Sequence, residues 1–310
     1  MIEDSGVESL RGQQRLVFRC VIEFMLDLVS RQIRKHDGDF TRAVIYMAAI
    51  QASRSPSRGE TDASTIRTFS VRAIAQSMAT PYETTRRKVA ELESAGLARR
   101  EGPRSYTVAP ATFDGDAYRA DCEATWRALR RLILDLRALN FDFNAFGSGA
   151  SLAVNRDLAQ TDLVEATAFL VNDFLLRVLE EGSAPHGSML DSAIICTLIC
   201  ANAEPLTHDP ELARQYSGAA TPPPDHLRTP ATITGLATAL GLTHETVRRR
   251  IRRYRALGWV TRVTGGYLLG IERMQQPEVL ETGLMISQQF LRLVQALRQL
   301  GVDPTTLKAA

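Results

Sequence analysis

Residues 83–89 read ETTRRKV and residues 245–251 read ETVRRRI, so nearly the same seven residues occur twice, 162 positions apart. When both stretches are extended to 18 residues, six positions are identical. The apolar positions keep their character, since Val89 corresponds to Ile251. Self-similarity of this kind indicates a supersecondary unit that is written twice in the chain.

Matches that flank the motif follow the same order in both halves of the chain. Their spacing is 150 positions before the motif and 161 after it, so the second unit carries about 12 additional residues. These fall within 204–228, where THDP and TPPPDH predict an exposed loop. The matched blocks are FMLDLV from Phe24 with FLLRVL from Phe174, FTRAVIYMAAI from Phe40 with LDSAIICTLIC from Leu190, and LRALNFD from Leu136 with LRQLGVD from Leu297.

The repeat predicts three parts of the chain: a first repeat over 1–145, a linker over 146–160 and a second repeat over 161–310. The linker contains FGSGAS, and its Gly and Ser favour flexibility. We expect a monomer with an internal pseudo-twofold axis, in which both halves of a dimer belong to one polypeptide. A further dimer of the whole chain is compatible with this arrangement.

Hydrophobic periodicity predicts the same order of elements in each repeat: two helices, a short helix, a turn, a second short helix, a hairpin and a long helix. In the first repeat, Ser70 and Thr80 are expected to cap the two short helices, with Pro81 at the first position of the second. Thr243 is expected to cap the corresponding helix of the second repeat. Gly96 and Gly258 are expected to end these two helices. The predicted long helices are 15–34, 40–52 and 117–139 in the first repeat and 277–300 at the end of the second.

This order of helix, turn, capped helix with ETxRR, terminating glycine and two-stranded hairpin resembles the winged helix-turn-helix of bacterial transcription regulators. The two motifs would cover about 65–110 and 229–270. The flanking helices follow an order similar to that of the MarR family, which forms homodimers, whereas this chain carries both halves itself. The resemblance implies a mainly α fold with small β-wings, an internal duplication of a helix-helix-winged helix-turn-helix-long helix unit, and a single-chain pseudo-dimer.

The resemblance also implies that recognition helices over 81–95 and 243–257 enter the major groove of double-stranded DNA. Arginine suits this role because its planar fork can pair with both acceptors of guanine. Glu83 and Glu245 either accept a hydrogen bond from cytosine or stabilise the start of the helix. The target would be a pseudo-palindromic or asymmetric site, because the two helices differ. The predicted DNA-binding residues are Tyr82, Thr84, Arg86, Arg87 and Arg104 in the first repeat, and His244, Thr246, Arg248, Arg249, Arg252 and Arg253 in the second.

The two recognition regions differ in charge. Six basic and four acidic residues over 81–104 give a net charge of +2, whereas seven basic residues and one acidic residue over 243–262 give +6. Contacts to phosphate supply most of the non-specific affinity for DNA. We therefore expect the second repeat to anchor DNA more strongly than the first.

These patterns favour a sequence-specific DNA-binding transcription regulator. One alternative is a plasmid-type replication initiator or another tandem winged-helix DNA-binding protein, which repeated sites near a replication origin would favour. A winged-helix protein-interaction module is the other alternative. The resemblance implies a small-molecule effector as a candidate partner, bound between the helical region and the winged domain.

The sequence lacks the motifs of the common enzyme classes. It contains no phosphate-binding P-loop, no HExxH and no GxSxG, so we expect no catalysis, no cofactor and no metal. The five histidines are expected in loops or on the surface. Cys196 and Cys200 lie one helical turn apart without further ligands at a zinc spacing, which favours core packing. A thiol redox sensor is the alternative for this pair.

Composition and hydropathy predict the location of the chain. Hydrophobic residues make up 45% and charged residues 23%, as is typical of globular proteins. The start, MIEDSG, has no basic region followed by an apolar stretch, and no apolar run reaches about 18 residues. We expect a cytoplasmic protein at the bacterial nucleoid without membrane contact.

Overall fold

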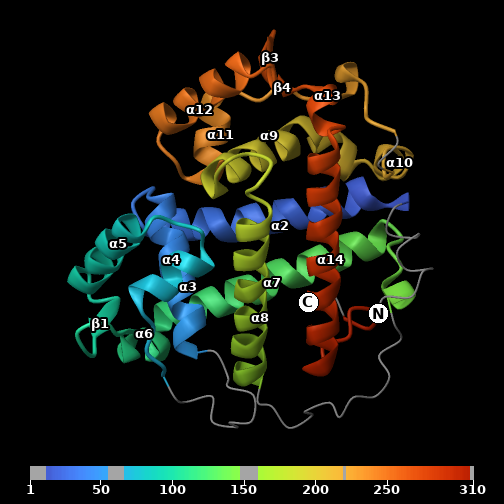
Figure 1. The fold of residues 1–310 in the computed structure, drawn as a ribbon. Coiled ribbons are helices and arrows are strands. Elements are labelled where there is room, and N and C mark those ends of the chain that lie inside the picture. Colours follow the sequence, from blue (N-terminus) through green and yellow to red (C-terminus); the bar gives the residue numbers. More distant parts are fainter. Residues whose placement is uncertain (1–11, 55–65, 147–159, 219–220, 308–310) are drawn as a thin grey trace.

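The computed structural model describes residues 12–54, 66–146, 160–218 and 221–307 (Figure 1). Over these residues the protein is mainly helical, with two small antiparallel sheets of two strands each. The predicted mainly α fold with small β elements is therefore confirmed. The predicted linker lies outside the described residues, apart from its two end positions.

The first half of the chain contains two long helices, a short α/β segment over 69–108 and a third long helix. Their order agrees with the sequence pattern, and the ends of the long helices differ from the predicted ones by at most two residues. The elements are α2 (Gln14–Lys35), α3 (Phe40–Arg54), α4 (Val71–Ser77), α5 (Tyr82–Ser94), β1 (Ala98–Arg100), β2 (Tyr106–Val108), α6 (Pro110–Asp114), α7 (Asp116–Ala138) and the 3₁₀ turn η1 (Phe143–Phe146).

The second half follows the same order, with its own α/β segment over 231–269 and with two added elements before it. These additions are α10 and η2. The elements are α8 (Gln160–Glu181), α9 (Met189–His208), α10 (Pro210–Gln215), η2 (Asp225–Leu227), α11 (Ile233–Leu240), α12 (His244–Ala256), β3 (Val260–Val263), β4 (Gly266–Leu269), α13 (Ile271–Met274) and α14 (Pro277–Gln299).

Each α/β segment packs two short helices beside a hairpin. The hairpins align Ala98 with Val108 and Val260 with Leu269. A glycine follows the second helix in both segments, and both glycines have a left-handed φ of 72°. A side chain would be strained in this conformation, which is why Gly96 and Gly258 end their helices as predicted.

The structure confirms two of the three predicted helix caps. The hydroxyls of Ser70 and Thr243 accept hydrogen bonds from backbone amides of the first turn. The prediction for Thr80 was wrong, because Pro81 is the N-cap and α5 begins at Tyr82. Thr80 lies one residue too early to reach the amides of the first turn, and its Oγ1 is 2.8 Å from Oγ1 of Thr85 instead.

The first helix of each half packs against helices of the other half (Figure 1). α2 contacts α9 and α14, and α8 contacts α3 and α7. One continuous hydrophobic cluster includes residues from both halves, such as Phe24 and Phe290. The long helices therefore form a shared core that carries both α/β segments.

The prediction of an exposed loop over 204–228 was wrong. α9 continues to His208 and α10 follows directly, so much of this stretch is helical. Leu206 and Tyr216 are buried in a second small hydrophobic cluster. The stretch is also attached to α2, because the buried guanidinium of Arg19 donates to the carbonyl oxygens of Tyr216 and Leu206 at 3.1 and 3.3 Å.

α9 is long and apolar enough to cross a membrane, by length and composition only. However, 67% of its most apolar window is buried inside the protein, where α9 packs against α2 and α11. Cys196 and Cys200 are buried on this helix, as expected for core residues. Burial raises the pKa of the Cys196 thiol to about 12.

Candidate nucleic-acid interface

α5 and α12 each have one buried face and one exposed face. The buried residues are those that the helical periodicity predicted: Thr85, Val89 and Leu92 on α5, and Val247, Ile251 and Tyr254 on α12. They lie three or four positions apart and pack against the other elements of each segment. The opposite faces present the predicted DNA-binding residues to solvent.

In the first half, the structure brings most of the predicted DNA-binding residues onto the exposed face of α5. The side chains of Arg86 and Arg87 are 58% and 68% exposed, and Tyr82 is an exposed aromatic residue. Thr84 is half-buried. Arg104 is exposed in the turn between β1 and β2.

In the second half, His244, Arg248, Arg249 and Arg252 are exposed on α12. Thr246 is half-buried, and its Oγ1 lies 2.8 Å from Oγ1 of the cap residue Thr243. This hydroxyl is therefore engaged in the helix start.

On both α5 and α12, the first arginine of the exposed face forms an ion pair with a glutamate, which the sequence analysis did not predict. Glu83 pairs with Arg86 at 2.9 Å, and Glu245 pairs with Arg248 at 2.7 Å. The carboxylate partner raises the pKa of both arginines. Exposed pairs contribute little to stability, so their main effect is to hold each guanidinium beside the helix N-terminus. The spacing of three residues is a signal from which these pairs could have been predicted.

A buried carboxylate attaches α12 to α9. Asp191 is fully buried and lies 2.8 Å from Nη1 of Arg250, and the hydroxyl of Tyr254 donates to it at 2.5 Å. Ser188 donates to the same carboxylate at 2.6 Å. Arg253, predicted to bind DNA, lies only 3.5 Å from it, so its guanidinium is shared with this internal contact.

The corresponding attachment in the first half is more exposed. Thr41 stands at the position that corresponds to Asp191, and Lys88 corresponds to Arg250. Lys88 pairs with Asp39 at the start of α3 and with Glu91 on α5. α5 is therefore held by a lysine that lies between two partly exposed carboxylates. α12 is held by an arginine that pairs with a buried carboxylate, Asp191.

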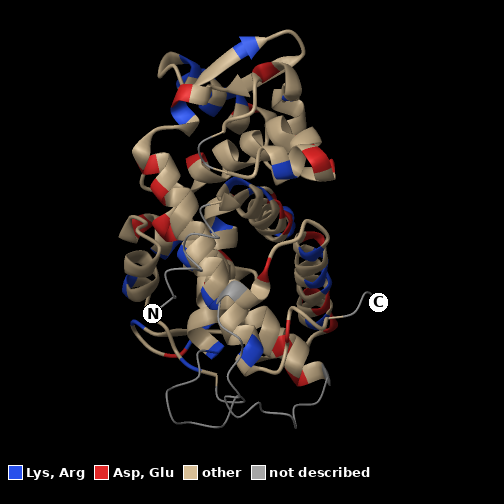
Figure 2. Ribbon diagram, turned by 90° about the vertical axis from the view of Figure 1, so that its right-hand side faces the viewer, with Lys and Arg blue, Asp and Glu red and all other residues tan. Residues whose placement is uncertain are grey.

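An open basic cleft of about 600 Å³ lies between α12 and β3. Arg252, Arg255 and Arg262 line it, all three exposed, and none of them forms an ion pair with a carboxylate of the described chain. Figure 2 shows Lys and Arg on this end of the molecule, at the top of the view. Only Arg252 was among the predicted DNA-binding residues, although Arg255 and Arg262 were counted in the net charge.

The corresponding positions of the first half, all within the described residues, hold no comparable cluster of free arginines. Ala90, Glu93 and Arg100 stand at the three corresponding positions. Arg100 lies 3.5 Å from Glu93 and its guanidinium stacks over the ring of Tyr106. The predicted difference in net charge between the two repeats thus corresponds to a difference in the number of arginines at these positions that lack a carboxylate partner and could bind an anion.

All five histidines lie in loops or on the surface, as predicted, but the two that lie in turns are buried. His36 and His186 are 2% and 5% exposed, and each follows the first long helix of its half. Their neighbours are aromatic: His36 contacts Tyr46, and His186 contacts Trp259. The pKa of each imidazole is lowered to about 4. Burial is the main cause, and the charge of a nearby arginine is the second.

The free energy of unfolding is expected to fall as the pH drops from about 6.5 to 4. His36 and His186 stay neutral in the folded protein to about pH 4, whereas in the unfolded chain they bind protons below about 6.5. Each histidine would lower the stability by about 3 kcal/mol at pH 4. Denaturant titrations of wild type and of His36→Phe, His186→Phe between pH 7.5 and 4.5 measure this. If the free energy of unfolding changed equally with pH in wild type and in the histidine variant, the lowered pKa of the two histidines would not explain the pH dependence.

Comparisons with models of protein families, with curated proteins and with solved structures found no match to this chain. Within the described residues, no group of three or more His, Cys, Asp and Glu side chains could hold a metal ion.

Proposed function

We propose that this protein is a sequence-specific double-stranded DNA-binding transcription regulator. The two α/β segments act as winged helix-turn-helix units, with α5 and α12 as recognition helices. An internal duplication supplies both units, and the long helices join them as a single-chain pseudo-dimer.

The duplication is supported by backbone hydrogen bonds that recur at corresponding positions. Leu97 donates to the carbonyl of Leu92, and Trp259 donates to that of Tyr254, in both cases just after the terminating glycine. The chain before each first short helix pairs with the last strand, Phe69 with Tyr106 and Ala231 with Tyr267. These contacts fix the same turn geometry in both segments, which similar helix order alone would not require.

One observation carries the proposal: two segments of the same architecture expose a pair of arginines at the same place on the second helix. Arg86 and Arg87 correspond to Arg248 and Arg249, and all four are exposed. A helix of this size fits the major groove, where a guanidinium can read guanine. A solvated helix face would not need the same pair in both halves.

The two units are proposed to contribute unequally. The free arginines of the cleft between α12 and β3 would contact phosphates, which supply affinity but no sequence information. In the first half, Glu93 pairs with Arg100 and weakens such contacts. The second unit would therefore anchor the DNA, and the first would add selectivity through Arg86 and Arg87.

Selection from a random pool of DNA duplexes tests the proposal. We expect a selected site with two unlike half-sites about ten base pairs apart, bound by one chain. The double variant Arg248→Gln, Arg249→Gln should bind this site about 10- to 100-fold more weakly and discriminate less at one half-site. The molar mass of the complex and the affinity at fixed salt are the measurements.

The matched control is Arg177→Gln. Arg177 is an exposed arginine on α8 that pairs with Asp173 one turn away, much as Arg248 pairs with Glu245. It should leave the affinity unchanged. The absence of any enriched duplex at moderate salt, or an equal loss in the control, would overturn the proposal.

A further inference from the structure

The turn between α2 and α3 lies where both α/β segments approach the long helices. Figure 1 shows this end of α2 between α5 of the first half and the helices α11 and α12 of the second. α2 contacts α11, and α3 contacts α5. Residues 34–39, which include this turn, are called the corner below. The corner therefore has neighbours in both units that are proposed to bind DNA.

The corner closely approaches the turn between α11 and α12, which is the turn of the second proposed helix-turn-helix. A Cβ atom added to Gly38 would lie 3.2 Å from the backbone oxygen of Gly241. One added to Gly241 would lie 2.7 Å from Cγ of Arg34. Both glycines have a left-handed φ, 79° and 71°. A side chain at Gly38 would therefore be strained and would push the two turns apart.

Arg34 adds hydrogen bonds to this contact. Its Nη2 donates to the carbonyl oxygens of Thr238 and Ala239 at 3.3 and 3.1 Å, and its Nη1 donates to the hydroxyl of Ser30 at 3.0 Å. The two carbonyls belong to the last turn of α11, where the helix dipole also favours a cation. One guanidinium thus joins α2 of the first half to the proposed helix-turn-helix of the second.

The same corner also holds α5 of the first half. Asp39 pairs with Lys88 of α5 at 2.5 Å, and its other carboxylate oxygen accepts a hydrogen bond from the amide of Arg42 at 2.9 Å. The side chain of Lys88 is only 12% exposed, so salt screens this pair less than a surface pair. Arg34 and Asp39 are five positions apart in the sequence, so one short segment contacts both units.

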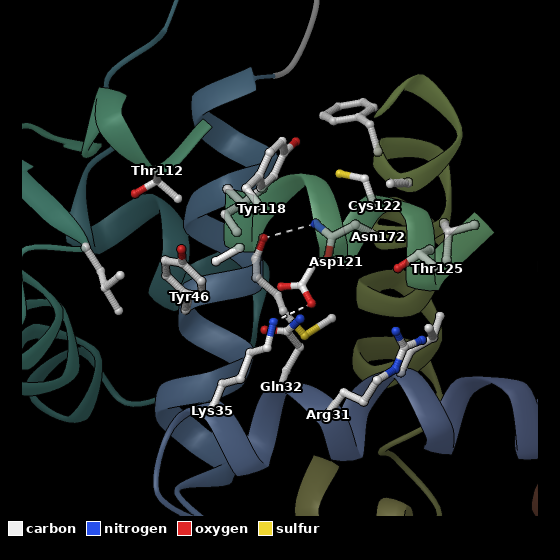
Figure 3. Close-up of a pocket in the computed structure, with 18 of the residues that line it drawn as sticks. Arg31, Gln32, Lys35, Tyr46, Thr112, Tyr118, Asp121, Cys122, Thr125 and Asn172 are labelled. Atoms are coloured by element: carbon white, nitrogen blue, oxygen red, sulfur yellow. Dashed lines mark hydrogen bonds and ion pairs between the residues drawn. The ribbon is translucent and has the colours of Figure 1, made fainter. Parts of the chain in front are cut away.

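Further contacts hold α2 and α3 close to the corner. Lys35 pairs with Asp121 of α7 (Figure 3). Asn172 of α8 donates to the carbonyl of Met47 and to Oε1 of Gln51, both on α3, at 3.1 and 2.9 Å. α3 is thereby attached to the second half as well. Packed helices and hydrogen-bond networks of this kind carry coupling between distant parts of a protein.

The second half lacks the side chains for the reverse contact. Ala184 corresponds to Arg34 and has no side-chain donor, and Met189 corresponds to Asp39 and has no carboxylate. Ala79 stands where the second half has Gly241. The first half alone therefore makes this connection, whereas a symmetric dimer would contain it twice.

We propose that the corner fixes the distance and the angle between α5 and α12, with Arg34 and Gly38 as positioning residues, and thereby determines which spacing of half-sites the protein accepts. The spacing step rests on the proposed function, whereas the fixed geometry does not. One base pair inserted between the half-sites moves the second by about 3.4 Å and turns it by about 34°. Two rigidly joined units cannot follow this change, so one of them loses its contacts.

Pulsed electron paramagnetic resonance of the full chain without DNA tests the fixed geometry. Spin labels are attached at Ser94→Cys and Ala256→Cys, which are corresponding exposed positions at the ends of α5 and α12, and the four native cysteines are buried. The corner variant carries Arg34→Ala and Gly38→Ala. We expect one narrow distribution of distances with the native corner, and a distribution about twofold broader or more in the corner variant.

The matched control carries Arg177→Ala and Gly187→Ala. Arg177 is exposed on α8 and pairs with Asp173 of the same helix, and Gly187 lies in the corresponding turn of the second half with a φ of 91°. A Cβ atom at Gly187 would lie 3.8 Å from Nη2 of Arg253, which is an ordinary contact. The control should keep the narrow distribution. An unbroadened distribution in the corner variant, or equal broadening in the control, would overturn the fixed geometry.

Affinity for the selected DNA site with no, one or two inserted base pairs tests the spacing step. We expect wild type and control to bind about 30-fold more weakly or worse after one insertion, and the corner variant to lose less than about fivefold. Affinity for the unaltered site should change less than about threefold in both variants, because no residue of the proposed interface is replaced.

The two steps can fail separately. Equal losses on insertion in wild type, control and corner variant would overturn the spacing step, even if the distances had broadened as expected. Failure of the wild-type chain to bind any DNA would overturn the proposed function and the spacing step with it. The distances between the labels, measured without DNA, would still decide whether the corner fixes the geometry.

Discussion

Replacing Arg252, Arg255 and Arg262 together with glutamine is expected to weaken DNA binding about 100-fold at moderate salt. These side chains line the open cleft between α12 and β3 and form no ion pair within the described chain. Each phosphate contact that is lost should reduce the slope of log affinity against log salt by about 0.9. The triple variant should therefore lower the slope by about 2 to 3, which fluorescence anisotropy over a salt series measures.

The matched control changes the net charge by the same amount on another face. Arg119, Arg127 and Arg131 lie on α7, are exposed, and each pairs with a carboxylate three or four positions away. Their replacement by glutamine should leave the salt slope unchanged. If both triple variants lost the same affinity, total charge would explain the binding and the cleft would have no particular role.

Local features of both halves could be predicted from the sequence because short-range physical chemistry determines them. Ser70 and Thr243 cap their helices through their own first turn, and Gly96 and Gly258 are required by a left-handed φ. The buried faces of α5 and α12 follow from helical periodicity. The exposed arginines then lie on the remaining face.

Contacts between distant parts of the chain were not predictable in the same way. Asp191 lies 59 positions before Arg250, and no spacing rule relates the start of α9 to the middle of α12. The packing of α2 and α8 against helices of both halves also leaves no local pattern in the sequence. As a result, Arg253 was assigned to DNA although its guanidinium lies near Asp191.

A further error arose from composition. Proline and polar residues over 204–228 are typical of loops, but Leu206 and Tyr216 provide enough apolar surface to hold this stretch against the core. His36 and His186 lie in turns, as the prediction allowed, but their burial was not predicted. An aromatic ring packs edge-on against each imidazole, Tyr46 of the next helix against His36 and Trp259 against His186.

Asp191→Asn is expected to lower the free energy of unfolding by about 3 kcal/mol and the melting temperature by about 5–10 °C. The substitution keeps the volume but leaves Arg250 without a carboxylate, and it disturbs the hydroxyl of Tyr254, whose pKa is raised by burial and by its bond to Asp191. Because Arg250 is 24% exposed, water recovers part of the loss, and we expect the lower end of the range for buried pairs. Chemical denaturation measures the change.

A double-mutant cycle with Arg250→Gln separates the ion pair from the rest of the site. The double variant should be more stable than the sum of the single effects predicts, because neither charge is then left alone in the interior. Asp39→Asn is the control in the first half, where Lys88 keeps Glu91 as a partner and the carboxylate is a third exposed. It should cost less than about 1 kcal/mol.

Under the proposed function, the cycle also tests whether Asp191 positions α12 for DNA. If Asp191 holds α12 in place, Asp191→Asn should weaken DNA binding at temperatures well below its melting transition, while Asp39→Asn should have a smaller effect. The expected loss is confined to α12, because the exposed residues of α5 do not contact Asp191. Equal destabilisation by Asp191→Asn and Asp39→Asn, or a coupling energy near zero between Asp191 and Arg250, would contradict this account of the second half as the more rigidly held unit.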